Sequence, residues 1–565
     1  MRSLAGLDVL VLDCQATGAS PAFGHVLEMG WGVVRAGEAE PRACEAHWIA
    51  LPEGHTVPGQ IRKLTGWQPD AAESAIADGE AWRRLRGAVA DATAVPTAIH
   101  YARFELPFLR AWAARFEPQG AFPFDAVCIF AIANRLYPQL PRLGLRALAG
   151  YLGHGVALER RARGHVEATA FVWQRLCADL ATRGVDTWED LQRWLGEKAP
   201  PRPRAKKPTY PIDSQRFRSL PDRPGVYRFL RCNGDVLYVG KAASLKKRTT
   251  SHFIGRTGKL LAPEMLTQVS DIAVTVTASA LEAALLENET IKALKPPYNV
   301  QLTAGDPRVW YSAATFDSAA ATAGDDHFIG PVPSEYSLRP LGALAALLDG
   351  APATLSVRAH AVGVSALWTP DEGVFRAGWS VLMTRHAAAV DQREPVQRRA
   401  LLLARHLIAF VAAQEEDDGD PAAAQENGAG GDDHSWDPER VARHVERAAA
   451  QAYRTFRRAR WLRLLHDSDV VYREPGAAES RRLRVRAGEV VAPEQGLTEQ
   501  GLSEEGMPDT AVRLASHFDR ARYDRLRILT SELKRILRDG GEVALYARGR
   551  RPVPARALRG IFAVV

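Results

Sequence analysis

The chain is organised around a stretch that begins Leu220-Pro221-Asp222-Arg223-Pro224-Gly225-Val226-Tyr227 and continues, after Cys232-Asn233-Gly234-Asp235, through Leu237-Tyr238-Val239-Gly240-Lys241-Ala242. Short apolar runs on either side of an Asn-Gly pair are typical of a β-hairpin. We therefore expect strands at residues 226–230 and 236–239. Such a hairpin places Tyr227 and Tyr238 on adjacent strands.

Two helices are predicted downstream of this hairpin. The first begins near Ser244, and it places Arg248 and His252 at positions i and i+4 of one face. The second covers residues 280–294 and includes Glu287. Its apolar face follows an i, i+3, i+4, i+7 pattern made by Leu281, Ala284, Leu285 and Asn288. Together these elements predict a small α/β domain over residues 210–303.

This domain resembles the GIY-YIG nuclease family, and in particular the branch formed by the N-terminal half of UvrC and its relative Cho. The name-giving tripeptides correspond to Gly225-Val226-Tyr227 and Tyr238-Val239-Gly240. His252 stands where UvrC usually has tyrosine, although other branches of the family use histidine there. The resemblance implies an active DNA endonuclease whose catalytic residues are Tyr227, Tyr238, Lys241, Arg248, His252, Glu287 and Asn299.

Phosphodiester hydrolysis explains why these residue types occur together. Glu287 is an anionic oxygen ligand suited to one Mg²⁺ or Mn²⁺ ion that keeps most of its waters. Arg248 offers a planar fork of donors to a phosphate. Tyr227 can accept a proton from the attacking water if the metal site lowers its pKa, and His252 or Lys241 are the alternatives for that role. We expect Asn299 to brace the site through side-chain hydrogen bonds.

The charge of this segment favours a polyanionic partner. From Arg216 to Lys259 there are eleven basic residues and two acidic ones, whereas the whole chain has a formal net charge of +7 and a pI of about 9.2. A phosphate backbone meets such a surface favourably. We therefore expect DNA to be the partner and Lys246, Lys247 and Arg248 to contact it.

The N-terminal region, residues 1–196, alternates strand-like and helix-like segments. Short apolar runs predict strands at 9–12, 26–34 and 98–100, and helical spacing occurs at 80–90, 104–116 and 164–180. This alternation predicts an α/β layer fold. Three segments resemble the motifs of the DnaQ-like (DEDDh) exonucleases, which implies an RNase H-like fold: 13–18, 100–109 and 160–169.

The exonuclease motifs are degenerate at the positions that carry chemistry. The family uses four carboxylates around two divalent metals and a histidine that activates water. This chain keeps Asp13, has the longer Glu105 at another carboxylate position, and has Gln15, Arg160 and His165 at the three remaining positions. We expect a pseudo-exonuclease that retains the fold. Arg160 and His165 either hold a phosphate or reflect neutral drift.

Residues 197–209 form a linker with four prolines and five basic residues from 197 to 208, for which an extended spacer is predicted. Residues 304–413 resemble the helical segment that follows the nuclease domain in UvrC and Cho. Residues 414–435 are rich in acid, Ala and Gly and are predicted to be a disordered acidic loop. Residues 436–565 are predicted to be a mainly helical, basic domain with a small sheet, which holds DNA, holds a partner or completes the fold.

The five cysteines are scattered, with no Cys-x-x-Cys pair and none after Cys232, so we expect neither a zinc site nor the iron–sulfur cluster that many UvrC proteins carry. No run of about 18 apolar residues predicts a membrane helix. The expected location is the cytoplasm, in association with the nucleoid.

The leading hypothesis is a Cho-like nuclease that makes a single-strand incision in damaged or structured DNA, with the exonuclease-like domain as a binding scaffold. UvrA- and UvrB-like proteins are possible loading partners. One rival is a bifunctional repair nuclease with a working 3′→5′ exonuclease. The other is a non-catalytic DNA-binding scaffold.

Overall fold

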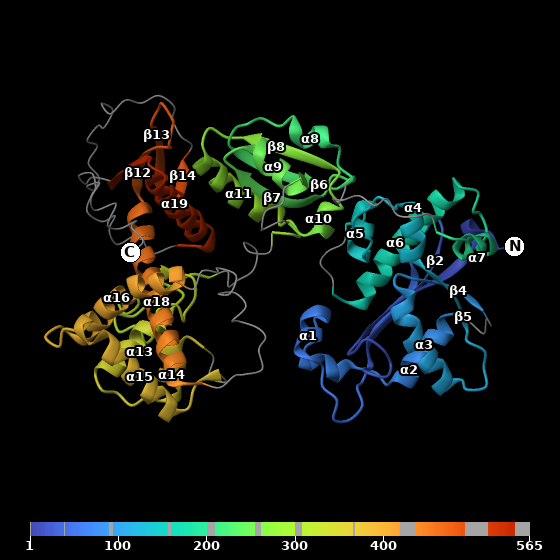
Figure 1. Ribbon diagram of the computed structural model, residues 1–565, viewed down its shortest axis with the longest axis horizontal. Coiled ribbons are helices and arrows are strands. Elements are labelled where there is room, and N and C mark those ends of the chain that lie inside the picture. The colour runs from blue at the N-terminus through green and yellow to red at the C-terminus, as the bar shows by residue number, and fades with distance from the viewer. Residues whose placement is uncertain are drawn as a thin grey trace. The chain divides into compact units, whose positions relative to one another are not determined.

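The computed structural model describes residues 2–38, 40–89, 94–155, 160–199, 210–254, 261–299, 308–364, 368–417, 436–491 and 518–547. The chain divides into two compact units, Met1–Thr303 and Ala304–Val565, and Figure 1 shows their elements. Most of the predicted linker and residues 418–435 of the predicted acidic loop lie outside the described residues.

A five-stranded sheet forms the N-terminal part of the first unit. Its order is β3-β2-β1-β4-β5, with antiparallel pairing from β3 to β1 and parallel pairing from β1 to β5. This is the predicted RNase H-like exonuclease arrangement. The strands are β1 (Asp8–Ala16), β2 (Val26–Arg35), β3 (Arg42–Trp48), β4 (Val95–Ile99) and β5 (Phe124–Cys128).

The first strand is longer than the sequence predicted. We expected it to end at Asp13, but β1 continues to Ala16 because Cys14 and Gln15 still pair with β2, opposite Met29 and Glu28. The register shifts between Gln15 and Ala16, where the pairing becomes irregular. The strand therefore carries both Asp13 and Gln15 along one edge of the exonuclease-like site.

Helices cover both faces of this sheet. One hydrophobic cluster joins β1, β2 and β4 to α4, α5, α6 and α7, and another joins the sheet to α2 and α3. The long helix α6 buries Val166, Val172 and Trp173 completely. The helices are α1 (Gly59–Thr65), α2 (Asp78–Ala88), α3 (Ala102–Phe116), α4 (Ile129–Leu136), α5 (Leu145–Tyr151), α6 (Ala162–Ala181) and α7 (Trp188–Gly196).

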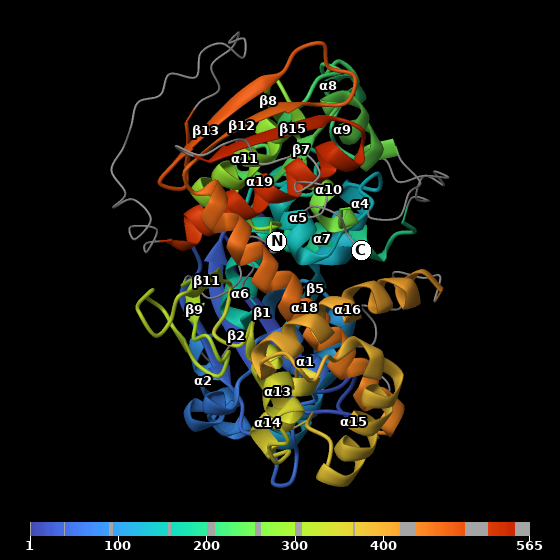
Figure 2. The same ribbon diagram turned by 90° about the vertical axis from the view of Figure 1, so that its left-hand side faces the viewer.

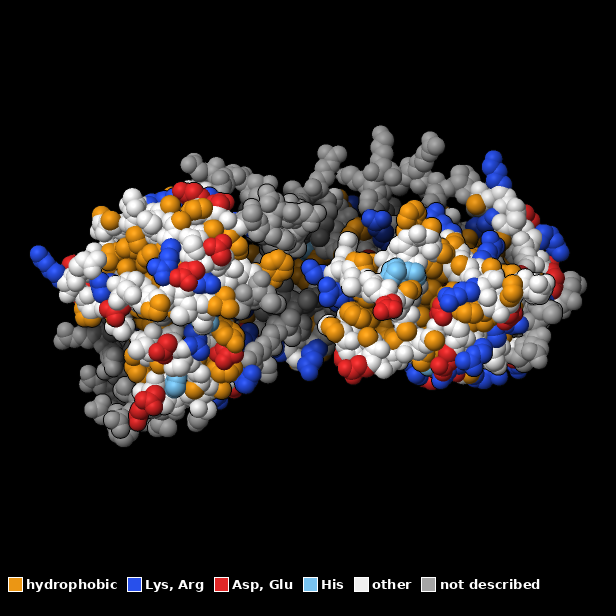
Figure 3. Space-filling model, turned by 90° about the horizontal axis from the view of Figure 1, so that it is seen from below, with side chains coloured by type: hydrophobic (Ala, Val, Ile, Leu, Met, Phe, Trp, Pro, Cys, Tyr) orange, Lys and Arg blue, Asp and Glu red, His pale blue; other side chains and the backbone are white. Residues whose placement is uncertain are grey.

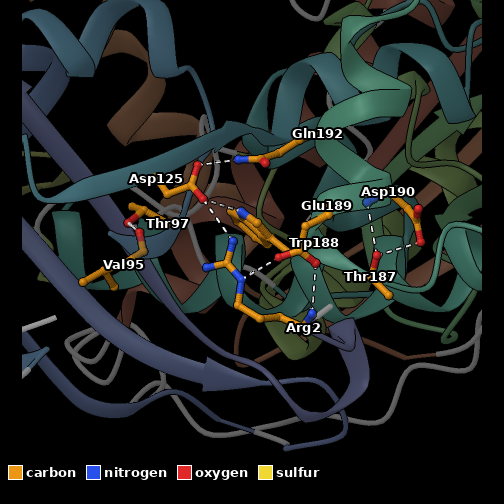
Figure 4. A network of polar contacts seen from close by, with 9 residues as sticks. All are labelled: Arg2, Val95, Thr97, Asp125, Thr187, Trp188, Glu189, Asp190 and Gln192. Atoms are coloured by element: carbon orange, nitrogen blue, oxygen red, sulfur yellow. Dashed lines mark hydrogen bonds and ion pairs between the residues drawn. The ribbon is translucent and has the colours of Figure 1, made fainter. Parts of the chain in front are cut away.

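A polar network ties the start of the chain to α7 and β5, as Figure 4 shows. The backbone N–H and Nε of Arg2 each donate a 2.9 Å hydrogen bond to Glu189. Asp125 on β5 accepts from Trp188 Nε1 at 2.8 Å and from Arg2 at 3.3 Å. Because Trp188 is fully buried, this network fixes the last helix of the domain against the sheet.

A three-stranded antiparallel sheet, in the order β7-β6-β8, forms the core of residues 210–299. The predicted hairpin joins β6 (Gly225–Leu230) to β7 (Val236–Ala242), and Gly234 adopts φ +89° in its turn. The sequence did not predict the third strand, β8 (Asp271–Val276). The surrounding helices are α8 (Ser214–Arg218), α9 (Leu245–Ile254), α10 (Pro263–Leu266) and α11 (Ala280–Leu294).

The second unit begins with a small sheet, β9 (Trp310–Ser312), β10 (Ala319–Ala320) and β11 (Ile329–Val332), beside a helical core. The core helices are α13 (Arg339–Leu348), α14 (Leu355–Val362), α15 (Glu372–His386), α16 (Val396–Asp417) and α18 (Pro438–Leu465). The prediction that the acidic loop begins at residue 414 was wrong by about one turn. The helix continues to Asp417 because glutamate propagates a helix readily.

A second antiparallel sheet, in the order β14-β13-β12-β15, ends the described part of this unit. Its strands are β12 (Ser468–Arg473), β13 (Arg481–Arg486), β14 (Glu489–Val491) and β15 (Glu542–Ala547). Helix α19 (Arg520–Arg538) contacts β12, β15 and α18 (Figure 2). Among the described residues, no helix is long and apolar enough to cross a membrane.

Candidate active site

Tyr227 lies at the centre of the candidate nuclease site, on β6, with only 1% of its surface exposed. Its partner across the hairpin is Gly240 on β7. A Cβ atom at position 240 would lie 2.5 Å from the Tyr227 hydroxyl oxygen. Only glycine therefore leaves room for the phenol to cross the neighbouring strand at this point.

The Tyr227 hydroxyl is surrounded by polar groups from three elements. Its oxygen lies 2.8 Å from Nε2 of His252 on α9. Tyr238 on β7 lies beside the same phenol, with 6.1 Å between the ring centroids, and Arg248 is close enough to affect its pKa. The structure thus brings together four of the seven predicted catalytic residues, Tyr227, Tyr238, Arg248 and His252.

Burial is the main influence on the pKa values of Tyr227 and His252. It raises the pKa of the Tyr227 phenol, with a further contribution from Tyr238, although the positive charge of Arg248 opposes the shift. Burial and Arg248 lower the pKa of His252 to about 4. At neutral pH the imidazole is therefore neutral and the phenol keeps its proton, so that Tyr227 donates its hydrogen bond to Nε2 of His252.

This electrostatic state differs from the condition that the sequence suggested for Tyr227. We considered a tyrosine whose pKa is lowered by a metal site, whereas the surrounding protein raises that pKa. The sequence also did not indicate that His252 contacts Tyr227, because the two are 25 residues apart on different elements. A neutral histidine beside the phenol supplies another way to remove its proton.

Glu287 lies on α11, next to the two tyrosines. The helix begins at Ser279, whose side chain accepts a hydrogen bond from the Glu282 backbone and so caps it. Oε1 of Glu287 accepts a 2.9 Å hydrogen bond from the Lys241 backbone N–H. The negative charge of Glu287 adds to burial in raising the pKa of Tyr238. The carboxylate is half-buried and the Lys241 residue is exposed.

Asn299 binds both backbone groups of Val239. Its side-chain oxygen accepts from the Val239 N–H, and its side-chain nitrogen donates to the Val239 carbonyl, each at 2.8 Å. Val239 lies between Tyr238 and Gly240 on β7. Asn299 thereby fixes the strand segment that carries the second tyrosine and the essential glycine.

The basic residues of α9 lie on the outside of the domain. Lys246, Lys247 and Arg248 are all exposed. Lys247 forms a 3.6 Å ion pair with Asp222, which also accepts a hydrogen bond from Ser244. Arg248 belongs both to this exposed stretch and to the hydrogen bonds around Tyr227, so it links the surface to the buried phenol.

Asp13 and His165 form the centre of the exonuclease-like site. Nδ1 of His165 lies 3.2 Å from Oδ2 of Asp13. Burial opposes protonation of His165, but the hydrogen bond and the charge of Asp13 outweigh it, and the pKa of His165 is raised. The two side chains therefore form an ion pair at the position where the resemblance implies two metal-binding carboxylates.

Glu105 has lost much of its capacity to act as an anion. Its side chain is 3% exposed and accepts a 3.1 Å hydrogen bond from the Cys14 N–H. Burial, and then the charge of Asp13, raise the pKa of Glu105 well above its usual range. The structure places Asp13, Glu105 and His165 together, and their surroundings favour the protonated forms of both Glu105 and His165.

The side chain of Gln15 contacts the main chain of Arg160. The Gln15 side-chain nitrogen donates to the Arg160 carbonyl at 2.5 Å, while its oxygen is buried without a hydrogen-bond partner among the described residues. The Arg160 guanidinium donates to the Lys63 carbonyl at 2.7 Å. Neither side chain supplies an anionic oxygen to the site.

Two further buried polar residues at this site were missed by the sequence analysis. Glu28 is fully buried and accepts hydrogen bonds from Arg161 at 2.6 Å and from the Ala162 N–H at 2.9 Å, so it satisfies the start of α6. His100 is 9% exposed and its pKa falls to about 4 through burial. The sequence signal for Glu28 was a charged residue within the otherwise apolar run 26–34.

The donor chemistry of the two sites differs in its suitability for a divalent metal. Within the part of the chain that the structure describes, no group of three or more His, Cys, Asp and Glu side chains is arranged to hold a metal ion. The half-buried carboxylate of Glu287 fits a Mg²⁺ ion that keeps most of its waters. The Asp13–His165 pair does not fit two Mg²⁺ ions, because an imidazole next to Asp13 supplies no anionic oxygen.

Known proteins resemble both regions of the first unit. The family profile of the UvrC-like GIY-YIG domain matches residues 223–300. The chain is 42% identical over 137 residues to UvrABC system protein C of Alkalilimnicola ehrlichii, which covers 23% of this chain and 22% of that protein. It is 29% identical over 303 residues to a "putative bifunctional exonuclease/endonuclease protein" of Mycobacterium tuberculosis, covering 52% and 45%. The chain therefore spans less than half the length of these relatives.

Solved structures resemble both regions. The GIY-YIG N-terminal endonuclease domain of UvrC from Thermotoga maritima, bound to its catalytic magnesium, is 30% identical and covers 15% of this chain and 92% of that domain, with a TM-score of 0.14. Exonuclease X in complex with 5′ overhanging duplex DNA is 16% identical and covers 33% and 99%, with a TM-score of 0.25. Residues 223–300 form a UvrC-like GIY-YIG endonuclease domain, and an exonuclease-like region precedes it.

Proposed function

We propose that this protein is a metal-dependent endonuclease that makes a single-strand incision in damaged or structured DNA through its GIY-YIG domain. The observation that carries the proposal is the convergence of Tyr227, His252 and Arg248 on one buried oxygen beside Glu287. A phenol, a neutral imidazole and a guanidinium supply the proton acceptor and the positive charge that phosphodiester hydrolysis requires.

Glu287 is the residue that would hold one Mg²⁺ or Mn²⁺ ion, and a bound ion supplies positive charge beside the scissile phosphate. The hydrogen bond from the Lys241 N–H to Oε1 orients the carboxylate from the edge of β7. Asn299 holds the same strand in place through Val239. The Lys241 N–H and the Asn299 amide, neither of which titrates, thus position the candidate metal ligand and the strand beside it.

Proton transfer follows from the geometry of Tyr227 and His252. In this proposal the phenolic oxygen takes a proton from the attacking water while its own proton passes to Nε2 of His252. The phenol therefore remains neutral throughout, which removes the need for a stable phenolate in a buried position. Arg248, which is close enough to Tyr227 to affect the pKa of its phenol, donates to the phosphate as negative charge develops on it.

The exonuclease-like domain acts, in this proposal, as a binding scaffold. The Asp13–His165 pair and the raised pKa of Glu105 leave few anionic oxygens for metals. The same changes reduce the repulsion between this pocket and a phosphate. A DNA strand can therefore approach the site without being hydrolysed there.

A bifunctional repair nuclease is the second candidate, favoured by the extended match to the bifunctional exonuclease/endonuclease protein of Mycobacterium tuberculosis. UvrA- and UvrB-like proteins remain proposed partners, since several relatives are components of UvrABC systems. We place the activity in the cytoplasm, on nucleoid DNA.

A plasmid-nicking assay tests the leading proposal. The full chain is compared with Glu287→Gln, which keeps the shape of the side chain but removes its charge, and with Arg248→Ala. We expect each substitution to lower the nicking rate by about 100-fold or more, as for the loss of a group that stabilises the transition state.

The matched control is Glu289→Gln, because Glu289 is an exposed carboxylate on the same helix, α11. This variant should nick at the wild-type rate. Comparable activity in wild type, Glu287→Gln and Arg248→Ala would instead support the non-catalytic scaffold. Damaged and undamaged plasmids in parallel reveal whether incision depends on a lesion.

A further inference from the structure

The second unit carries a concentration of positive charge on α18. Between Glu446 and Asp467 the sequence contains no acidic residue. The same interval contains six arginines, Arg447, Arg454, Arg457, Arg458, Arg460 and Arg463. Charged surface helices usually mix both signs, as on the face of the molecule drawn in Figure 3, where basic and acidic side chains are interspersed. The C-terminal half of α18 departs from that pattern.

A matching row of side chains lies on the helix that packs beside it. Helix α19 contacts α18, and its positions 523, 527 and 534 fall at i, i+4 and i+11, on one face of a helix. They carry Tyr523, Arg527 and Lys534. Arg458 on α18 lies close enough to Tyr523 to lower the pKa of its phenol against the effect of burial. The row therefore continues from one helix to the other.

The cations of this row differ from other arginines of α19 in their pairing. In the described ranges, none of Arg458, Arg527 and Lys534 forms an ion pair, and Nε of Arg527 is buried without a hydrogen-bond partner. By contrast, Arg525 binds Glu489, and Arg535 binds Glu474 and Glu532. Among the described residues, the paired arginines of α19 and the cations of the row are therefore distinct sets.

This arrangement has an electrostatic cost in the absence of an anion. Burial, followed by the positive charges of Arg458 and Arg457, lowers the pKa of Lys534. Arg458 and Arg527 both lie close enough to Tyr523 to oppose the rise in its pKa that burial causes. A polyanion placed along the row would relieve the repulsion among these groups.

We propose that Arg458, Arg527 and Lys534, which are half-buried above the buried Tyr523, bind the phosphodiester backbone of DNA. Guanidinium forks bind phosphate oxygens in pairs, and lysine adds single donors. Arg527 and Lys534 are seven residues apart, which is about 10 Å along α19 at 1.5 Å per residue. That length accommodates consecutive phosphates of one strand.

Phosphate contacts of this kind do not depend on base sequence. They would give the second unit a function of its own, which is to bind DNA. The choice of DNA as the polyanion rests on the proposed nuclease function of residues 210–303, whereas the presence of a phosphate-binding surface does not. The second unit would hold the substrate strand while the GIY-YIG domain cuts it.

Fluorescence anisotropy with a labelled 30-base-pair duplex, without divalent metal and over a range of salt concentrations, tests this proposal. The full chain carrying Glu287→Gln is compared with the same chain carrying Arg458→Gln, Arg527→Gln and Lys534→Gln. We expect the dissociation constant to rise at least about 10-fold near physiological salt. The slope of log affinity against log salt should fall by about two to three, since each lost phosphate contact removes about 0.9.

The control variant removes three cations elsewhere in the same unit, through Arg376→Gln, Arg398→Gln and Arg538→Gln. Each of these arginines is exposed and already paired, with Glu372, Glu394 and Asp539 respectively. The control should bind within about 2-fold of the parent, with the same salt slope. Equal losses in the two triple variants would overturn the proposal, and so would an unchanged slope in the first.

Lys534→Gln alone covers the case in which the first triple variant does not fold, as judged by circular dichroism. Lys534 has no partner to lose among the described residues, and a decrease of about one in the salt slope is expected. Nicking separates this proposal from the proposed function. A protein that binds DNA through this row but nicks equally well with Glu287→Gln sinks the catalytic proposal and leaves the binding surface intact.

Discussion

His252 and His165 lie in the two nuclease-type sites of this chain, and their surroundings have opposite effects on them. His252 contacts a neutral phenol, and burial together with Arg248 lowers its pKa to about 4. His165 contacts a carboxylate, and its pKa is raised despite burial. The surroundings therefore favour the neutral, proton-accepting form of His252 and the protonated form of His165.

The two sites differ in the groups that lie beside their carboxylates. At the exonuclease-like site, Nδ1 of His165 lies 3.2 Å from Oδ2 of Asp13. At the GIY-YIG domain, Oε1 of Glu287 accepts a 2.9 Å hydrogen bond from the Lys241 main-chain N–H. The comparison therefore concerns which groups surround the acidic residues, and not only how many acidic residues each site has.

The largest expected effect concerns the pair Tyr227 and His252. Tyr227→Phe and His252→Ala should each lower the rate of nicking by about 100-fold or more, because each interrupts the same proton transfer. The double variant should be slower than either single variant by no more than about 3-fold, since residues that act as a unit are not additive. Single-turnover kinetics on a supercoiled plasmid provides the measurement.

Tyr210→Phe is the control for this pair. Tyr210 is a half-buried tyrosine of the same domain whose ring packs edge-on against Phe253, 5.9 Å between centroids. Its hydroxyl has no place in the proposed proton transfer, so the variant should nick normally. Losses that multiply in the Tyr227 and His252 double variant would show that the two residues act separately.

A smaller effect, in the direction of gain, is expected when the exonuclease-like site is given back its anions. In a Glu287→Gln background, Gln15→Glu, Arg160→His and His165→Asp restore the residue types that the family resemblance implies. With Mn²⁺ and single-stranded DNA, we expect 3′→5′ degradation to rise at least about 10-fold above the background of the parent, because the site regains ligands for two metals.

Adding Asp13→Asn to the restored chain should abolish the gain, since Asp13 is the retained carboxylate. Robust degradation by the parent itself would support the bifunctional enzyme instead. The longer side chain of Glu105 limits how far activity returns, and Glu105→Asp in the restored chain tests that limit.

Local patterns of residues were sufficient to predict the elements that carry the nuclease site. The Asn-Gly pair predicts the β6–β7 hairpin because glycine tolerates the positive φ of Gly234. The apolar spacing of α11 predicts its buried face, where Leu281 and Ala284 are fully buried. The family resemblance predicts an RNase H-like fold, and the observed mixed five-stranded sheet agrees with it.

Contacts between distant segments could not be predicted in the same way. The Asp13–His165 pair joins residues 152 positions apart, and the Tyr227–His252 bond depends on how α9 packs against β6. The missed strands β8 and β15 contain polar residues such as Thr275 and Glu542, which weaken their hydrophobic pattern. Protonation states depend on burial, which a linear sequence does not contain.

The pH dependence of nicking gives the smallest expected effect and bears directly on the two histidines. The folded-state pKa of His252 lies below its usual value, so its neutral, proton-accepting form is present above about pH 4 and is lost as the pH falls through that value. A histidine with the usual pKa of about 6.5 would be about 90% protonated at pH 5.5. We therefore expect kcat/KM at pH 5.5 to remain within about 2-fold of its value at pH 7.

His165→Gln is the matched control. It removes the other histidine and should leave the dependence of kcat/KM on pH between 7 and 5.5 unchanged. Circular dichroism and DNA binding at each pH separate loss of catalysis from loss of fold or of substrate. A fall of about 10-fold between pH 7 and 5.5, centred near 6.5, would mean that His252 titrates as if exposed. In that case burial would not distinguish the two sites, and the opposite roles assigned to their histidines would have to arise from the facing residues alone.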